Sequence, residues 1–260
     1  MKSITMRSIW NGTIAFGLVN IPIKLYSAID HSSLDLDMLD VRDHEHIKYQ
    51  RINEKTRKEV PFEKIVKGYK LKDNYIILEE RDFEDASPEK TKSIDIQNFV
   101  KSSEINPMLF ETSYYAEADK QGQKAYKLLL TALKKTNMAG VGQFVLRQKE
   151  NLCIIHPQDN VIVISRIRFA QEIKDASEIN TPDDLIVPKK ELDVALALIK
   201  QYTSDFDISK YKDTYTAELL KIIKAKAKGV RPTIKKLKPN KAKSDDLYEQ
   251  LMESLNKKGA

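Results

Sequence analysis

Short runs in which apolar and polar residues alternate occupy much of the first two thirds of the chain. From Ile21 to Tyr26 every second residue is aliphatic, which is the period of a half-buried strand. Residues 8–29 predict two short strands around a glycine bend. Pro22 lacks an N–H group and predicts that the second strand lies at a sheet edge or begins there. Further strand-like runs cover residues 74–80, 93–100, 112–118, 141–148, 151–157 and 160–169. So many short strands with one interrupting helix favour a barrel or a sandwich.

The 3.6-residue period of amphipathic helices appears in four segments. These are residues 122–137, 189–202, 214–228 and a C-terminal helix that Ser244 can cap. Gly140 follows the first of them, and Pro188 opens the second. No internal repeat is apparent.

Composition narrows the class of protein. The chain has 260 residues, of which 41% are hydrophobic, enough for a real core. Its single cysteine, Cys153, excludes an intrachain disulfide framework and a cysteine-based zinc site, and its apolar neighbours predict a core residue. No apolar stretch is long enough for a membrane span or a signal peptide, so we expect a cytosolic protein.

The charge is unevenly distributed along the chain. Residues 221–243 contain ten Lys and Arg and no acidic residue, whereas the other 34 basic and 38 acidic residues sum to −4. A slightly acidic body with a strongly basic tail is typical of proteins that bind a polyanion, either nucleic acid or an anionic membrane. A solubilising, disordered end is the alternative.

Signs of catalysis are weak. His44, Glu45 and His46 lie together, with His31 nearby, and the two alternating histidines would share one face of a strand. This is not the spacing of a helical zinc site, and a polar exposed loop or ribbon is the favoured interpretation. No phosphate-binding glycine loop and no G-x-S-x-G motif occurs. A binding protein for a polyanion is therefore favoured, with a metal-dependent nuclease as one alternative and an RNA-binding protein as another, although no aromatic-rich basic strand suited to base stacking is apparent.

Long motifs identify a resemblance. The stretch "MRSIWNGTIAFGLVNIPIKLYSA" resembles the start of the bacterial Ku proteins, which bind double-strand DNA ends. Residues 99–147 resemble the central block of that family, residues 205–229 its helical arm and residues 244–258 its C-terminal tip. These motifs follow in the family's order from Met6 onward, and Met6 rather than Met1 is then the expected start.

The resemblance implies an α+β fold without a cofactor. It implies a β-barrel core at 6–185 whose extended bridge, roughly residues 30–80, closes a ring in a homodimer. A helical arm at 186–228 and a basic linker with an amphipathic tip at 229–260 would follow. Some relatives carry a Cys-x-x-Cys pair in the bridge, but Asn53 and Thr56 stand at the matching places here, so no metal role is carried over.

The implied function is sequence-independent binding of double-strand DNA ends in non-homologous end joining, with recruitment of the ATP-dependent end-joining ligase. Lys24 would face the DNA from the barrel. Residues 47–60 read as a ribbon that tracks phosphates or as a solvated hairpin. The expected phosphate contacts are Lys24, Lys48, Arg51, Arg57, Lys58, Lys235, Lys236, Lys238, Lys241 and Lys243. Such a protein would work in the bacterial cytosol, on the nucleoid when bound to DNA.

The C-terminal tip presents an apolar stripe. Its members are Leu247, Tyr248, Leu251, Met252 and Leu255. A helix of about 13 residues is marginal alone, so it must dock. The family suggests the ligase as partner, and packing onto its own chain is the alternative.

Overall fold

The computed structural model describes residues 6–30, 34–86, 92–146, 149–230 and 246–257. Its contacts divide the chain into two compact units, residues 1–31 with 36–175 and residues 32–35 with 176–260. Among the described residues, the first unit holds a closed seven-stranded barrel and a long insertion, and the second holds three α-helices.

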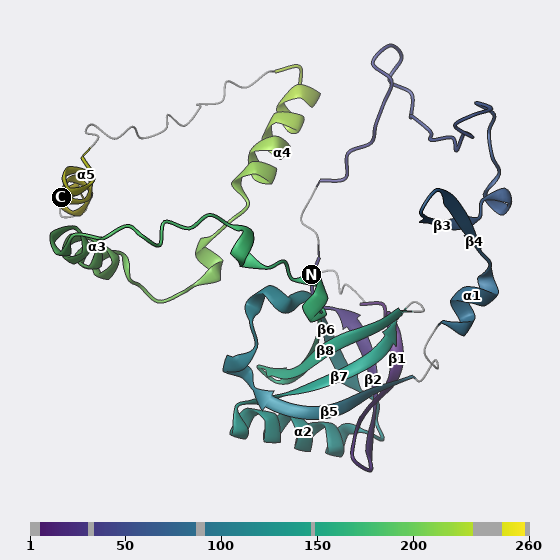
Figure 1. Ribbon diagram of the computed structural model, residues 1–260, viewed down its shortest axis with the longest axis horizontal. Coiled ribbons are helices and arrows are strands. Elements are labelled where there is room, and N and C mark those ends of the chain that lie inside the picture. The colour runs from purple at the N-terminus through teal and green to yellow at the C-terminus, as the bar shows by residue number, and fades with distance from the viewer. Residues whose placement is uncertain (1–5, 31–33, 87–91, 147–148, 231–245, 258–260) are drawn as a thin grey trace. The chain divides into compact units, whose positions relative to one another are not determined.

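The barrel has the strand order β1-β2-β6-β9-β8-β7-β5. Its strands are β1 (Trp10–Phe16), β2 (Val19–Ser27), β5 (Ser93–Lys101), β6 (Phe110–Ala118), β7 (Met138–Leu146), β8 (Lys149–Gln158) and β9 (Val161–Ile167). All neighbouring strands are antiparallel except β1 and β5, whose parallel pairing closes the barrel. Of the two architectures that the strand pattern allowed, the barrel is therefore the one formed (Figure 1).

Alternation along the strands builds the core. Ile21, Ile23 and Leu25 of β2 are fully buried, and they pack with residues of every other barrel strand. Helix α2 (Gln123–Thr136) lies against the barrel and adds Leu129, Leu130 and Leu133 to the same cluster. Branched aliphatic side chains dominate this core, as in a strand-rich interior.

One local expectation needs correction, and another is confirmed. Strand β2 is paired on both sides, so Pro22 does not mark an edge strand. The proline is accommodated because the pairing with β6 begins only at Ile23, and Pro22 contributes its carbonyl oxygen, which accepts from the Asp119 N–H at 3.0 Å. Helix α2 ends where the sequence pattern predicted, at Asn137, whose φ of 54° places it in the left-handed region that often caps helices.

The insertion joins β2 to β5. It contains a two-stranded hairpin, β3 (Lys67–Leu71) and β4 (Asn74–Leu78), and a short helix, α1 (Glu80–Asp85). The sequence pattern predicted the strand at β4 and missed β3 and α1. None of the described residues 34–86 is buried.

The second unit consists of helices α3 (Lys189–Tyr202), α4 (Thr214–Ala227) and α5 (Leu247–Lys257), close to their expected bounds. Asp213 caps α4 by accepting the Thr216 N–H at 3.0 Å, whereas Ser244 lies outside the described residues. Helices α3 and α5 pack together in parallel. Tyr248 lies beside the start of α3, and the Gln201 side chain near its end donates to the Leu255 carbonyl oxygen at 3.3 Å.

Candidate nucleic-acid interface

Lys24 lies on the outer side of the barrel wall because its neighbours Ile23 and Leu25 point inward. Its Nζ atom is 3.2 Å from Asp119 Oδ1, and this hydrogen bond raises the pKa of Lys24. Glu117 lies directly across from Lys24 on β6. A phosphate would have to compete with Asp119 in an acidic setting. The expected contact at Lys24 therefore stays a prediction, and its ion pair is a feature that the sequence did not reveal.

A groove of about 690 Å³ is lined by Glu117, the residue across from Lys24, and by three tyrosines, Tyr26, Tyr115 and Tyr126, among others. The Tyr26 hydroxyl donates to Glu117 at 2.6 Å, which raises the pKa of Tyr26. Tyr126 donates to the Ala116 carbonyl and accepts from a β9 backbone N–H. The hydroxyls of Tyr26 and Tyr126 are therefore already engaged within the wall, and the groove, whose lining includes Lys127 and Glu117, presents no excess of cations for phosphate.

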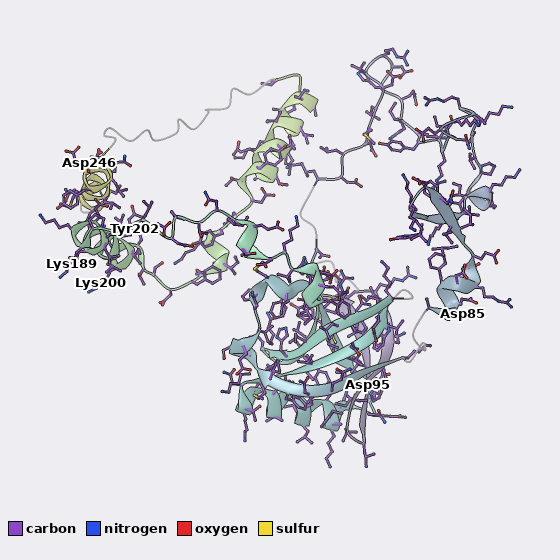
Figure 2. All side chains as sticks on the ribbon, viewed as in Figure 1. Asp85, Asp95, Lys189, Lys200, Tyr202 and Asp246 are labelled. Atoms are coloured by element: carbon purple, nitrogen blue, oxygen red, sulfur yellow. The ribbon has the colours of Figure 1, made fainter. Side chains whose placement is uncertain are left out.

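The insertion is divided by charge into three parts. Residues 34–46 carry five acidic residues and one arginine, a net −4, and residues 73–86 carry six acidic residues and one arginine, a net −5. Between them, residues 47–72 carry nine Lys and Arg against three Glu, a net +6. Figure 2 shows side chains projecting along the whole insertion, with Asp85 near its end. An exposed cationic section between two acidic ones is suited to holding a polyanion at its middle.

Four of the expected phosphate contacts lie in this middle section. Lys48, Arg51, Arg57 and Lys58 are all exposed. The guanidinium of Arg51 lies over the Phe62 ring, 5.2 Å from its centroid, which orients the cation without neutralising it. The structure therefore gathers these four residues in one chain section and separates them from Lys24, which lies on the barrel wall.

Further exposed cations share the section, and the sequence analysis did not select them. They are Lys55, Lys64, Lys67, Lys70 and Lys72. The net charge of residues 47–72 is the signal that could have found them. The hairpin also carries Tyr69 and Tyr75, but the pairing of Lys70 with Tyr75 and of Tyr69 with Ile76 puts the two rings on opposite faces. Bases cannot stack on both rings along one face, so the hairpin is no shared stacking platform.

Two turns in the insertion repeat the same backbone thirteen residues apart. In each, a bridge closes the turn, Leu39 with His46 and Ile52 with Glu59. The fifth residue of each six-residue turn has a positive φ, 60° at His44 and 57° at Arg57. Their backbone hydrogen bonds also correspond. The two turns share a conformation and not a residue pattern, so this repeat of the backbone was not apparent from the sequence.

In each turn, the side chain of the first residue accepts a backbone N–H group of a later turn residue. Asp40 accepts the Arg42 N–H at 2.9 Å, and Asn53 accepts the Thr56 N–H at 2.9 Å. Arg42 also bonds the Asp40 carboxylate and lowers its pKa. Residues 40–45 carry a net −2, whereas residues 53–58 carry a net +2. The same shape therefore presents opposite charge at the two places.

The histidine cluster does not assemble a metal site in the described chain. His44 and His46 belong to the first turn, with Glu45 between them, and all three are exposed. Within the described ranges, no group of three or more His, Cys, Asp or Glu residues is placed to hold a metal ion. His31 lies outside these ranges. The nuclease alternative thus gains no support from the geometry.

The expected contacts of the C-terminal region divide into two groups. Lys235, Lys236, Lys238, Lys241 and Lys243 lie outside the described residues. In the tip, Leu251, Met252 and Leu255 are half-buried on the helix that packs against α3, while Leu247 is 56% exposed and Tyr248 39%. Packing onto the chain's own helix therefore occurs, and it leaves the first turn of the tip open.

No described helix is long and apolar enough to cross a membrane.

Comparison with known proteins adds the family. The profile of the Ku70/Ku80 beta-barrel domain matches residues 15–194. The chain is 39% identical to a protein of Opitutus terrae named non-homologous end joining protein Ku, over 98% of this chain and 93% of that one. It is 36% identical to the protein of that name from Coxiella burnetii (85% and 83% covered) and 37% identical to that from Bacillus subtilis (86% and 73% covered). Among solved structures, the SPOC domain of human PHD-finger protein 3 gives a TM-score of 0.31 at 12% identity, covering 62% of this chain and 97% of that one, too low to indicate a shared fold.

Proposed function

The chain belongs to the Ku family, and on that premise we propose that it binds double-strand DNA ends in non-homologous end joining. The observation that carries this proposal is the exposed cationic section at residues 47–72. It contains nine Lys and Arg, among them Lys48, Arg51, Arg57 and Lys58, against three glutamates, and none of its residues is buried.

Such a surface suits the task that the family name describes. A repair protein must accept any end sequence, so contacts to base edges would restrict it. Contacts to phosphates are independent of sequence, and their contribution weakens as salt rises. Lys and Arg on a solvated, extended segment can follow a phosphate backbone without reading bases.

We propose that two copies form the DNA-binding ring. The insertion exposes many large apolar side chains, including Phe62, Tyr69, Tyr75 and Ile77. An isolated two-stranded hairpin is at best marginally stable in water, and exposed apolar patches and open strand edges favour association. A second copy of the chain would cover these surfaces and close the insertion around the duplex, which then enters only through an end.

We propose the C-terminal tip as the contact for the ATP-dependent end-joining ligase. Leu251 and Leu255 are half-buried beside α3. The apolar surface that stays accessible to the ligase therefore consists of Leu247 and Tyr248 at the exposed start of the helix. The linker cations from Lys235 to Lys243 would add loose phosphate contacts beyond the ring.

The deciding experiment compares linear duplex with covalently closed circles of the same sequence. We expect linear duplex to bind and small circles to compete poorly, measured by competition in a gel-shift assay at fixed salt. Several unrelated linear sequences serve as controls and should bind alike. Equal affinity for linear and circular DNA would contradict the proposal.

A further inference from the structure

Strand β3 of the insertion has an open edge. The sheet that contains it has only the two strands β3 and β4, as far as the described residues show. An open edge presents a row of N–H and C=O groups ready to pair with another extended segment. The hairpin buries none of its residues, so it gains little stability from its own packing.

The pleat of β3 sorts its side chains onto two faces. Tyr69 and Leu71 lie on one face together with Ile76 of β4, and these three are 65%, 55% and 50% exposed. Lys70 lies on the opposite face, directly across from Tyr75. A third strand on this edge would have to offer apolar groups on the first face and an anion on the second.

A segment with that pattern lies near the start of the insertion. In Leu36–Asp37–Met38, two apolar side chains flank an acidic one, and Leu36 and Met38 are 63% and 55% exposed. The structure assigns it to no strand, and within the described chain no backbone hydrogen bond joins residues 34–37 to another segment. Met38 is held at one side only: its carbonyl oxygen accepts the Ile47 N–H at 3.0 Å, and its sulfur accepts the Tyr49 hydroxyl at 3.3 Å. Asp37 forms no ion pair with a described residue.

We propose that Leu36–Met38 of a second copy adds to the open edge of β3 as a third strand. Leu36 and Met38 then pack beside Tyr69 and Leu71, and Asp37 pairs with Lys70 on the other face. This match holds for either strand direction, because the period of both segments is two. Addition of an extended segment to a sheet edge is a common mode of protein recognition.

The second copy is favoured over the chain's own segment by a simple argument. A segment of the same chain is present at high effective concentration, yet in the single chain it is not paired with β3. In a twofold dimer, each copy gives its segment and receives the partner's, so two equivalent contacts form. This inference rests on the proposed homodimer and specifies where the copies meet.

Cysteine crosslinking tests the contact. Differently tagged full-length chains carrying Asp37→Cys and Lys70→Cys are co-expressed and oxidised. We expect a covalent dimer that contains both tags. The native cysteine does not interfere, because Cys153 is fully buried and burial raises the pKa of its thiol to about 12.

Tyr75→Cys is the matched control. Tyr75 lies on the same face as Lys70 but one strand further from the open edge of β3. Its Cα would lie about 10 Å from that of residue 37, beyond the reach of a disulfide, which needs roughly 4.4–6.8 Å. Crosslinking of Tyr75→Cys as strongly as Lys70→Cys would overturn the proposed edge.

Light scattering on the wild-type protein measures its mass and so tests the homodimer independently of the contact between Leu36–Met38 and β3. A wild-type dimer without the Asp37–Lys70 crosslink overturns this contact and leaves the homodimer intact. A wild-type monomer overturns the homodimer itself. If the double variant Asp37→Cys/Lys70→Cys forms only an intrachain disulfide, the segment pairs within its own chain and the proposal is wrong.

Charge reversal gives a second measurement. Lys70→Glu and Asp37→Lys each place like charges at both contacts of a dimer, so each variant alone should shift toward monomer. Mixed dimers have one native contact and one with the charges exchanged, so co-expression should restore the dimer. If the two variants pair at random, so that mixed dimers are not enriched over dimers of a single variant, the contact is contradicted.

Discussion

A partly buried chain of side-chain hydrogen bonds crosses three strands of the barrel. His156 Nε2 lies 3.0 Å from the Ser165 hydroxyl, which lies 2.9 Å from the Ser113 hydroxyl. Ser165 is 1% exposed, and the Phe110 ring stands edge-on to the imidazole. Desolvation lowers the pKa of His156, so the neutral ring is the form that the fold favours.

This histidine should make the barrel sensitive to mild acid. Because the pKa of His156 is lower in the folded protein than in the unfolded chain, the unfolded chain binds more protons below its ordinary pKa of about 6.5. The contribution of His156 to the free energy of unfolding is therefore fully present above pH 6.5. It decreases as the pH falls from 6.5 toward the pKa of His156 in the folded protein, by at most about 1.4 kcal/mol per pH unit.

The measurement is denaturant unfolding between pH 7.5 and 5.5. His156→Gln should flatten the profile, whereas His44→Gln, which removes an exposed imidazole, should leave it unchanged. An unchanged profile in His156→Gln would show that other groups set the acid sensitivity.

Single residues were predictable where their neighbours in sequence decide their setting. The aliphatic run around Cys153 predicted a core residue, and that prediction is confirmed by its full burial. The setting of Lys24 was not predictable, because its partner Asp119 follows 95 positions later and approaches only through the pairing of β2 with β6.

At the scale of elements, the cationic section of the insertion should dominate the salt dependence of DNA binding. Changing Lys48, Arg51, Arg57 and Lys58 to Gln should weaken binding to all sequences alike. The slope of log affinity against log salt should fall by up to about 3.6, since each phosphate contact contributes about 0.9. Fluorescence anisotropy at several salt concentrations measures the slope.

The double variant Lys134→Gln/Lys135→Gln is the control for loss of positive charge outside the insertion. Both residues are at the end of α2 on the barrel, away from the insertion in sequence. Their double variant should retain the slope. If the fourfold variant also retains it, the phosphates are held elsewhere.

Two variants of the C-terminal helix α5 should distinguish its packing onto α3 from its proposed contact with the ligase. Leu251→Asp places a charge in the α3–α5 contact and should release α5, seen as faster amide exchange in both helices. Leu247→Asp changes an exposed side chain and should leave α5 docked. Both variants should bind DNA ends normally, and both should lose ligase stimulation, measured as joined product per time. Normal stimulation in Leu247→Asp would exclude its exposed face as the recruiting surface.

Periodicity predicted the elements that bury a face and missed those that do not. The barrel strands and helices α2, α3 and α4 follow their hydrophobic patterns closely. Strand β3 was missed because its five residues include two lysines and Gly68 and bury nothing, so no inward face marks the pattern. The repeated turns were missed because hydrogen bonds of Asp40 and Asn53, rather than matching residues, define them.

At the scale of the whole molecule, a closed ring predicts retention that salt cannot reverse. Protein is loaded on linear duplex, both ends are then blocked with bulky groups, and salt is raised to a level that breaks phosphate contacts. We expect release from open duplex and retention on blocked duplex, because a threaded ring leaves only through an end. Equal release from both would indicate a clamp that opens sideways.

The family and the barrel could be predicted from sequence, whereas the surface at which we propose that two copies meet could not. Long motifs fixed the expected order of core, arm and tip, and the profile match at residues 15–194 confirms the family. The exposed surfaces of the insertion carry no periodic signal of their own. They emerged only when the structure showed that residues 34–86 bury nothing.

The attachment of the insertion also has a mechanical consequence. The insertion leaves from the end of β2 and returns at the start of β5, and both strands pair with β1. Ser27 and Ser93 both lie toward the first half of β1, since Leu25 pairs with Trp10 and Ser93 with Thr13. A pull on the insertion away from that end of the barrel drags β2 and β5 in the same direction along β1. Both ladders are then loaded in shear, so their hydrogen bonds resist together instead of opening one after another.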